Sequence, residues 1–178
     1  MIKNIKRITA RQVAYDVLLK VNKERAYSNL ALDCSLKSSA LELRDKAFVS
    51  ALVYGVIERQ ITIDYVLSLY LSKPLSRMKA EPLTVLRLGA FQILFSSSIP
   101  DSAAVNESVK LSKANGFSYA SGMINAVLRK VSKNGLTLPD EENRALYLSV
   151  KCSCPQWLVE KWLLEYGEKN TLSVLNHS

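Results

Sequence analysis

Apolar residues recur at helical spacing along almost the whole chain, and this pattern constrains the fold more than any other feature. Val13, Val17, Leu18 and Val21, for example, fall on one face of a helix. No run of residues alternates between apolar and polar with a period of two, as a half-buried strand would. The sequence therefore predicts an all-α protein, with a bundle of about seven helices over residues 9–134.

Capping residues mark where several of these helices should begin and end. Thr9–Gln12 and Ser39–Glu42 both have the capping-box pattern, so we expect a helix to start at each. Pro82 fits the first turn of another helix. Gly116 and Gly135 each follow an asparagine and fit left-handed helix ends.

Two features indicate how the bundle packs. The helix expected from about Pro82 to Phe95 is apolar on most sides, which is typical of a helix at the centre of a bundle. Gly55 lies in the middle of a predicted helix, where glycine lowers helix propensity. We therefore expect another element to pack closely against it.

The last part of the chain differs from the bundle. Residues 136–154 are less regular, a further helix is expected to start at Ser153–Gln156, and Gly167 looks like its end. We predict two regions, a domain formed by the helical bundle over 1–135 and a linker with a small helical extension over 136–178.

Charge is the first indication of a partner. The chain has 24 basic and 16 acidic residues, a net charge of +8. Residues 1–30 have seven basic and two acidic residues, residues 31–136 have thirteen and eight, and residues 137–178 have four and six. A basic body with a slightly acidic end indicates a polyanionic partner, although a basic protein without such a partner fits almost as well.

Nine basic side chains are the candidate RNA contacts, and the alternative for all of them is a solvated surface. One set leads into the first helix, and five more cations come from two late helices that could lie side by side. These residues are Lys3, Lys6, Arg7 and Arg11, followed by Lys110, Lys113, Arg129, Lys130 and Lys133.

Residues for catalysis or cofactor binding are not apparent. There is no glycine-rich dinucleotide or phosphate loop, and His177 is the single histidine. Cys152 and Cys154 lack the further ligands that a zinc site needs. We therefore predict no catalytic, cofactor-binding or metal-binding residues in this chain.

Cysteine usage and hydropathy bear on where the protein works. Three cysteines do not form a disulfide framework. The strongly apolar stretch from Val85 to Phe95 is interrupted by Arg87 and Gln92 and is too short to span a membrane. We expect a cytoplasmic protein without a membrane partner.

Several polar and aromatic residues favour a structural role over a functional one. Arg87 and Glu107 lie within apolar helix faces, and we expect a buried hydrogen-bonded network that includes a pair between them. Trp157 and Trp162 lie on an amphipathic C-terminal helix, where packing is the more frequent use. That helix could also dock on a neighbour outside this chain.

Six segments, in this order and spacing, resemble one family along nearly the whole chain. They are YSNLAL (27–32), RDKAFVSALVYGVIER (44–59), RLGAFQILF (87–95), IPDSAAVNESVKL (99–111), GMINAVLRKV (122–131) and CPQWLVEKWLLEYG (154–167). Together they resemble the NusB-like N-terminal domain of the RsmB/Sun family of 16S rRNA (cytosine-5) methyltransferases. The family usually has histidine where this chain has Cys154.

The resemblance implies a NusB-like fold of two helical subdomains that positions small-subunit ribosomal RNA. In that family, S-adenosylmethionine and two catalytic cysteines belong to a C-terminal domain that this sequence does not contain, and neither Cys152 nor Cys154 matches those cysteines. The expected partners are ribosomal RNA and the protein's own catalytic domain. The alternative is a stand-alone antitermination factor that binds RNA with a ribosomal-protein partner. Asn115, Tyr119 and Met123 match the RNA-contacting positions of such factors poorly.

Overall fold

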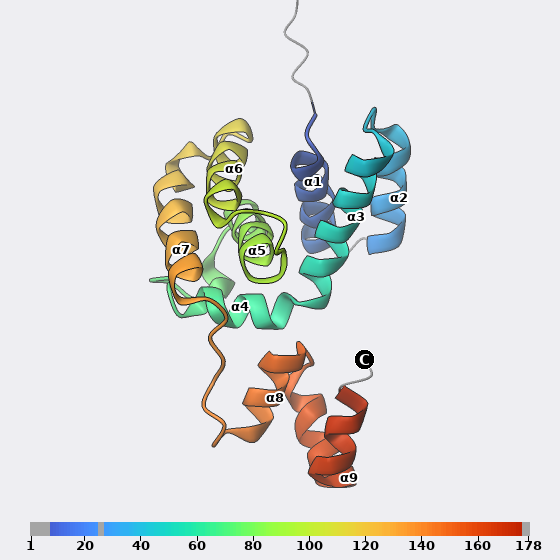
Figure 1. Cartoon of the computed structure of the whole chain (residues 1–178), viewed down its shortest axis with the longest axis vertical. Coiled ribbons are helices and arrows are strands. Elements are labelled where there is room, and N and C mark those ends of the chain that lie inside the picture. The colour runs from blue at the N-terminus through green and yellow to red at the C-terminus, as the bar shows by residue number, and fades with distance from the viewer. Residues whose placement is uncertain (1–7, 25–26, 176–178) are drawn as a thin grey trace, which may run out of the picture.

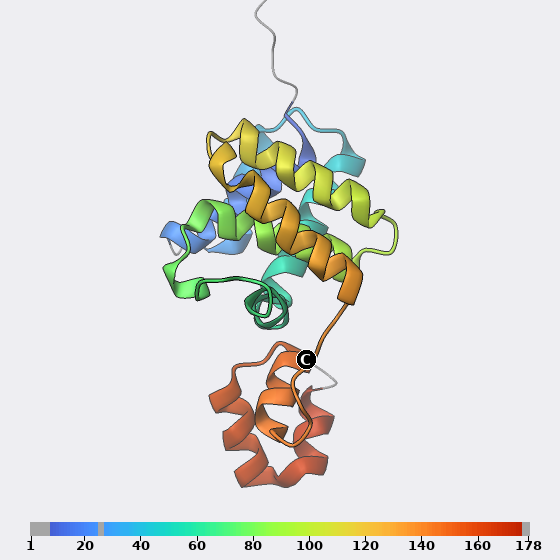
Figure 2. The same ribbon diagram turned by 90° about the vertical axis from the view of Figure 1, so that its left-hand side faces the viewer.

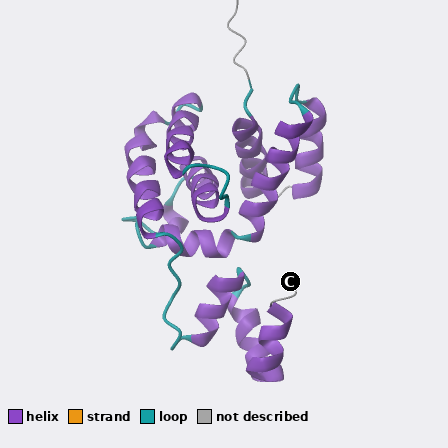
Figure 3. Ribbon diagram, in the orientation of Figure 1, coloured by secondary structure: helices purple, strands orange, loops and turns teal. Residues whose placement is uncertain are grey.

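The computed structural model describes residues 8–24 and 27–175, and these residues form helices and turns without any strand (Figure 3). Two single-turn 3₁₀ helices, η1 (Leu75–Arg77) and η2 (Ser118–Ala120), lie between longer elements. The α-helices are α1 (Ala10–Glu24), α2 (Ser28–Ser38), α3 (Leu43–Glu58), α4 (Gln60–Ser68), α5 (Ala80–Phe95), α6 (Asp101–Ala114), α7 (Ser121–Asn134), α8 (Arg144–Cys152) and α9 (Gln156–Leu175).

The first seven α-helices form the predicted bundle, in two halves. Helices α1, α2 and α3 pack together on one side, α5, α6 and α7 on the other, and α4 crosses beneath them (Figure 1). Helix α1 also packs on α5 and joins the halves. One continuous hydrophobic cluster runs through both. The all-α, NusB-like bundle of about seven helices expected from the sequence is confirmed.

Helix α5 lies at the centre of this bundle, as its all-round apolar character predicted. Leu86 and Leu88 are completely or almost completely buried. A Cβ atom on Gly89 would lie 2.5 Å from Leu128 Cδ1 and 2.6 Å from Ser108 Oγ, so glycine lets α6 and α7 approach α5 closely.

Close packing at Gly55 is also confirmed. A Cβ atom there would overlap the Phe91 ring of α5. Gly55 lowers the helix propensity of α3, but because it has no side chain it allows α3 and α5 to pack closely.

One of the two predicted capping boxes forms in part. Thr9 Oγ1 accepts a hydrogen bond from the Gln12 backbone N–H at 3.2 Å and caps α1. The prediction at Ser39–Glu42 is wrong, because Ser39 Oγ donates to the Leu36 carbonyl at 3.0 Å and closes the preceding helix instead. Helix α3 then begins only at Leu43.

The C-terminal helices form a compact pair with its own small core (Figure 2). Helix α8 was not predicted within the less regular stretch; Asn143 Oδ1 caps it by accepting from the Leu146 N–H at 3.2 Å. Gly167, at φ 71° and ψ 170°, has non-helical backbone angles and interrupts α9 where the sequence predicted a helix end, and a second helical stretch follows it to Leu175. The region boundary at residue 135 stays a prediction.

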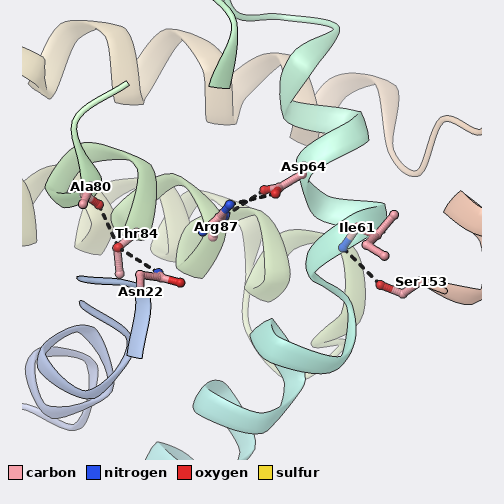
Figure 4. Close-up of polar contacts among 7 residues, drawn as sticks. All are labelled: Asn22, Ile61, Asp64, Ala80, Thr84, Arg87 and Ser153. Atoms are coloured by element: carbon pink, nitrogen blue, oxygen red, sulfur yellow. Dashed lines mark hydrogen bonds and ion pairs between the residues drawn. The ribbon is translucent and has the colours of Figure 1, made fainter. Parts of the chain in front are cut away.

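Two hydrogen bonds join this pair to the bundle. Ser153 Oγ accepts from the Ile61 N–H at 3.1 Å, at the start of α4 (Figure 4). Thr62 Oγ1 donates to the Val150 carbonyl of α8. None of the described helices is long and apolar enough to cross a bilayer.

Candidate nucleic-acid interface

Six of the nine predicted RNA contacts lie on described helices. Lys3, Lys6 and Arg7 are outside the described residues. The six fall into two groups: Arg11 of α1 with Lys110 and Lys113 of α6, and Arg129, Lys130 and Lys133 of α7.

These two groups lie at opposite ends of the α6–α7 pair, because the two helices run antiparallel (Figure 2). Ser132 Oγ donates to Asp101 Oδ2 at 2.7 Å and fixes the C-terminal end of α7 beside the first residue of α6. An α-helix rises about 1.5 Å per residue, so Lys113 and Lys133 lie at ends of the pair that are roughly 15–20 Å apart, whereas Arg129 lines the same surface hollow as Asn106, one turn before Lys110. The five late cations therefore spread along the α6–α7 pair, and their action as one RNA-binding patch stays a prediction.

The α7 group, defined as Arg129, Lys130 and Lys133, is a cluster of exposed positive charge. Arg129 Nε donates to Asn125 Oδ1 of the same helix at 3.1 Å. Among the described acidic side chains, none forms an ion pair with these three cations. Their charge is thus available to an anionic partner.

Arg11 is held more tightly than a surface phosphate contact would be. Its Nε donates to Oε1 of the buried Gln92 at 2.7 Å, and its guanidinium lies 5.2 Å from the centre of the Phe48 ring. Burial lowers the pKa of Arg11, while the nearby Glu107 carboxylate opposes that shift. Arg11 therefore joins α1, α3 and α5, and it also reaches the surface beside α6.

The two lysines of α6 are both exposed, but they differ in their partners. Lys110 Nζ lies 2.7 Å from Glu107 Oε1, in a pair whose lysine side chain is 73% exposed. Such a pair contributes little to stability and opens readily for another anion. Lys113 has no ion pair among the described residues.

An exposed aromatic residue near the α6 end was not among the predicted contacts. Tyr119 of η2 is 69% exposed, and Lys79 Nζ lies 5.6 Å from the centre of its ring. Phe117, two residues earlier, is buried. The signal available in the sequence was an aromatic residue shortly after the glycine turn at Gly116, a position that can present a ring for stacking on a base.

The predicted pair between Arg87 and Glu107 is wrong, because Arg87 has a different acidic partner. Arg87 Nε and Nη2 donate to the two carboxylate oxygens of Asp64, each at 2.7 Å, and tie α5 to α4 (Figure 4). Glu107 pairs with Lys110 instead. The structural role of Arg87 is confirmed, because its side chain is only 11% exposed and donates to both carboxylate oxygens of Asp64.

Cys152 and Cys154 flank the junction between α8 and α9 as free thiols. Burial raises the pKa of both thiols. Within the described part of the chain, no group of three or more His, Cys, Asp or Glu side chains is placed to hold a metal ion.

The two tryptophans of α9 differ in their surroundings. Trp162 packs against the small C-terminal core, as expected, whereas Trp157 is 66% exposed. Packing therefore accounts for only one of them.

Comparison with known proteins places this architecture among relatives of two kinds. The model of the NusB family matches residues 8–133. The chain is 33% identical over 164 residues to the probable ribosomal RNA small subunit methyltransferase B of Bacillus subtilis, in a match that covers 92% of this chain but only 36% of that protein. It is 35% identical over 136 residues to the transcription antitermination protein NusB of Latilactobacillus sakei, in a match that covers 71% of this chain and 96% of that protein.

Solved structures agree on the fold. NusB of T. maritima superposes with a TM-score of 0.67 at 23% identity, over 72% of this chain and 91% of that one. A chain from a complex of the antitermination factors NusB and NusE with double-stranded RNA superposes with a TM-score of 0.64 at 21% identity. The match covers 70% of this chain and 93% of that one. At these identities the likeness concerns the fold alone.

Proposed function

The chain belongs to the NusB family, and from this premise we propose that it is an RNA-binding domain that positions small-subunit ribosomal RNA for methylation. The methyl transfer itself, from S-adenosylmethionine to carbon 5 of a cytosine, would be the work of a catalytic domain outside this chain. The present residues would supply binding and orientation only.

The extent of the similarity carries this proposal. The match to the Bacillus subtilis methyltransferase covers 92% of the chain, whereas the match to the Latilactobacillus sakei antitermination protein covers 71%. The family model stops at residue 133, before α8 and α9. A match over 92% of the chain must extend into α8 and α9, so this helical pair belongs to the part that the chain shares with the methyltransferase.

The charge distribution supports RNA as the ligand. The exposed α7 group has no acidic partner among the described residues, Lys113 forms no ion pair with them, and Lys79 lies over the exposed Tyr119 ring. Cations that contact phosphates release counterions, which makes binding to RNA favourable and sensitive to salt. A related fold is found in the complex of NusB and NusE with double-stranded RNA.

A second candidate function is that of a stand-alone antitermination factor. One observation favours it: the chain covers 96% of the Latilactobacillus sakei antitermination protein at 35% identity. This function would require binding to a short RNA element together with a ribosomal protein, and it would give α8 and α9 no defined task.

The intact mass of the native gene product separates the two candidates. A mass well above the 19.9 kDa of this chain, with S-adenosylmethionine-dependent methylation of small-subunit RNA, is the result expected for the methyltransferase. A product near that mass which binds RNA only together with a ribosomal protein would establish the antitermination factor instead.

Charge removal tests which surface binds RNA. We expect the triple variant Arg129→Gln, Lys130→Gln and Lys133→Gln to bind single-stranded RNA more weakly. The slope of log affinity against log salt should become shallower by about 0.7 for each phosphate that the variant no longer neutralises. The matched control changes Arg44, Lys151 and Lys169, which are exposed on α3, α8 and α9 and form no ion pair among the described residues, to glutamine. Equal losses of affinity in the two triple variants would show that only net charge matters and would refute the assignment of the α7 group.

A further inference from the structure

A cavity of about 320 Å³ opens between the start of α1 and the end of α6, next to Arg11. Its volume is at the lower end of the ~300–1,000 Å³ typical of small-ligand pockets. Ile8, Leu111 and Ala114 give it an apolar wall, and Arg11, Glu107 and Lys110 give it charged groups. It has the size and the mixed lining that a flat, polar-edged ring requires.

We propose that this cavity receives one unpaired nucleobase of the bound RNA. The inference rests on the proposed RNA-binding function and deepens it, because it adds a base contact to a surface so far described only by its cations. The apolar wall would cover the face of the ring, and the charged groups would meet its edge.

Arg11 and Glu107 provide complementary hydrogen-bonding groups for that edge. Among the described residues, only the Nε of Arg11 is hydrogen-bonded, so its two terminal nitrogens retain their N–H donors. A guanidinium donates to ring nitrogens and carbonyl oxygens, and a carboxylate accepts from exocyclic amino groups. Bases expose both kinds of group on their edges once they are unpaired.

The walls of the cavity are held in place before any ligand binds. Gln12 and Asn115 form a reciprocal amide pair, with Gln12 Nε2 donating to Asn115 Oδ1 at 3.0 Å and Asn115 Nδ2 donating to Gln12 Oε1 at 2.9 Å. Their remaining amide hydrogens are taken by Asp16 and by the Leu111 carbonyl. Both amides therefore act as a rigid frame, which lowers the cost of ordering the site upon binding.

Charge around the opening favours a nucleotide over an apolar protein side chain as the occupant. Lys110 is largely exposed at the rim, and Lys113 follows one turn later on α6. Phosphates on either side of an inserted base would lie within reach of these flexible side chains. The Lys110–Glu107 pair can open for this purpose because it is exposed to solvent.

The test fills the cavity without changing charge. Ala114 is exposed at the end of α6, so Ala114→Trp should fold normally while its ring occupies the space. Ala51→Trp, on the exposed face of α3, is the matched control. Affinity for a short unstructured RNA is measured by fluorescence anisotropy, both for the intact RNA and for a series that carries one abasic nucleotide at successive positions.

We expect Ala114→Trp to weaken RNA binding about tenfold, as removal of one stacked base does, with an unchanged salt slope and no effect of Ala51→Trp. For the unaltered chain, one abasic position in the RNA should lower the affinity by about the same factor. For Ala114→Trp, the same abasic position should lower the affinity no further. If the unaltered chain binds RNA but neither change weakens it, the base site is refuted while the proposed function stands. If the unaltered chain does not bind RNA, both are refuted.

Discussion

Ser153 joins the C-terminal helical pair to the bundle. Substitutions at this position can separate the stabilising hydrogen bond of its side chain from the destabilising strain of its backbone. Ser153 is the one non-glycine residue with a positive φ among the described residues, at φ 54° and ψ 37°. Its Oγ also accepts the Ile61 N–H at 3.1 Å, at the first turn of α4. One residue thus carries backbone strain and caps a helix that is distant in sequence.

The two substitutions at this position should differ. Ser153→Ala removes the acceptor and leaves the amide of a helix start unpaired, which costs about 1 kcal/mol in measured helix caps. Ser153→Gly removes the same bond, but it relieves left-handed strain of roughly 1–2 kcal/mol. Glycine also makes the unfolded chain more flexible, which lowers the free energy of unfolding by about 0.5–1 kcal/mol and offsets part of that gain. We therefore expect alanine to destabilise by about 1 kcal/mol and glycine to leave stability nearly unchanged.

Urea unfolding followed by tryptophan fluorescence measures this difference directly. Both tryptophans, Trp157 and Trp162, lie in α9, so their signal reports the helical pair that Ser153 anchors. Ser118→Ala is a control, because this exposed serine should change stability by no more than about 0.5 kcal/mol. Equal stability of the alanine and glycine variants, or an alanine variant as stable as the unaltered chain, would refute the reasoning.

Three further predictions concern the bundle. Gly89→Ala should lower stability by about 1–3 kcal/mol, because its Cβ would clash with the fully buried Leu128, and chemical denaturation measures the loss. Arg87→Met should destabilise by about 2 kcal/mol by leaving Asp64 without its partner, and the loss should shrink when Asp64→Asn is added in a double-mutant cycle. Burial raises the pKa of Tyr15 to about 12, so ultraviolet titration should show a tyrosine that ionises late. The folded state then holds that proton more tightly than the unfolded state, and stability should fall as pH rises from about 10 to 12.

The bundle could be predicted from the sequence because its determinants are local. Apolar periodicity, Pro82 and the glycines at 55, 116 and 135 each specify a helix or a close approach without reference to distant residues. The box at Ser39–Glu42 failed because Ser39 has a competing acceptor in the preceding turn. Helix α8 was not predicted because it is only nine residues long and its small core needs contacts from α9.

The candidate site was harder to predict because it depends on how helices pass one another. Cations on α6 and α7 are close in sequence, yet the antiparallel pairing puts Lys113 and Lys133 at opposite ends. Arg87 looked able to reach Glu107, but the crossing of α4 beneath α5 offers it both oxygens of Asp64. Tyr119 was set aside because it matches the RNA-contacting position of antitermination factors poorly, whereas the packed chain leaves its ring exposed.

The salt dependence of RNA affinity tests the central claim most directly. We expect this chain to bind a single-stranded fragment of small-subunit ribosomal RNA, with a slope of log affinity against log salt of about −2 to −4, as three to six phosphate contacts would give. Removing the charges of the α7 group should make that slope shallower. No binding at low salt, or an affinity that does not change with salt, would contradict the account.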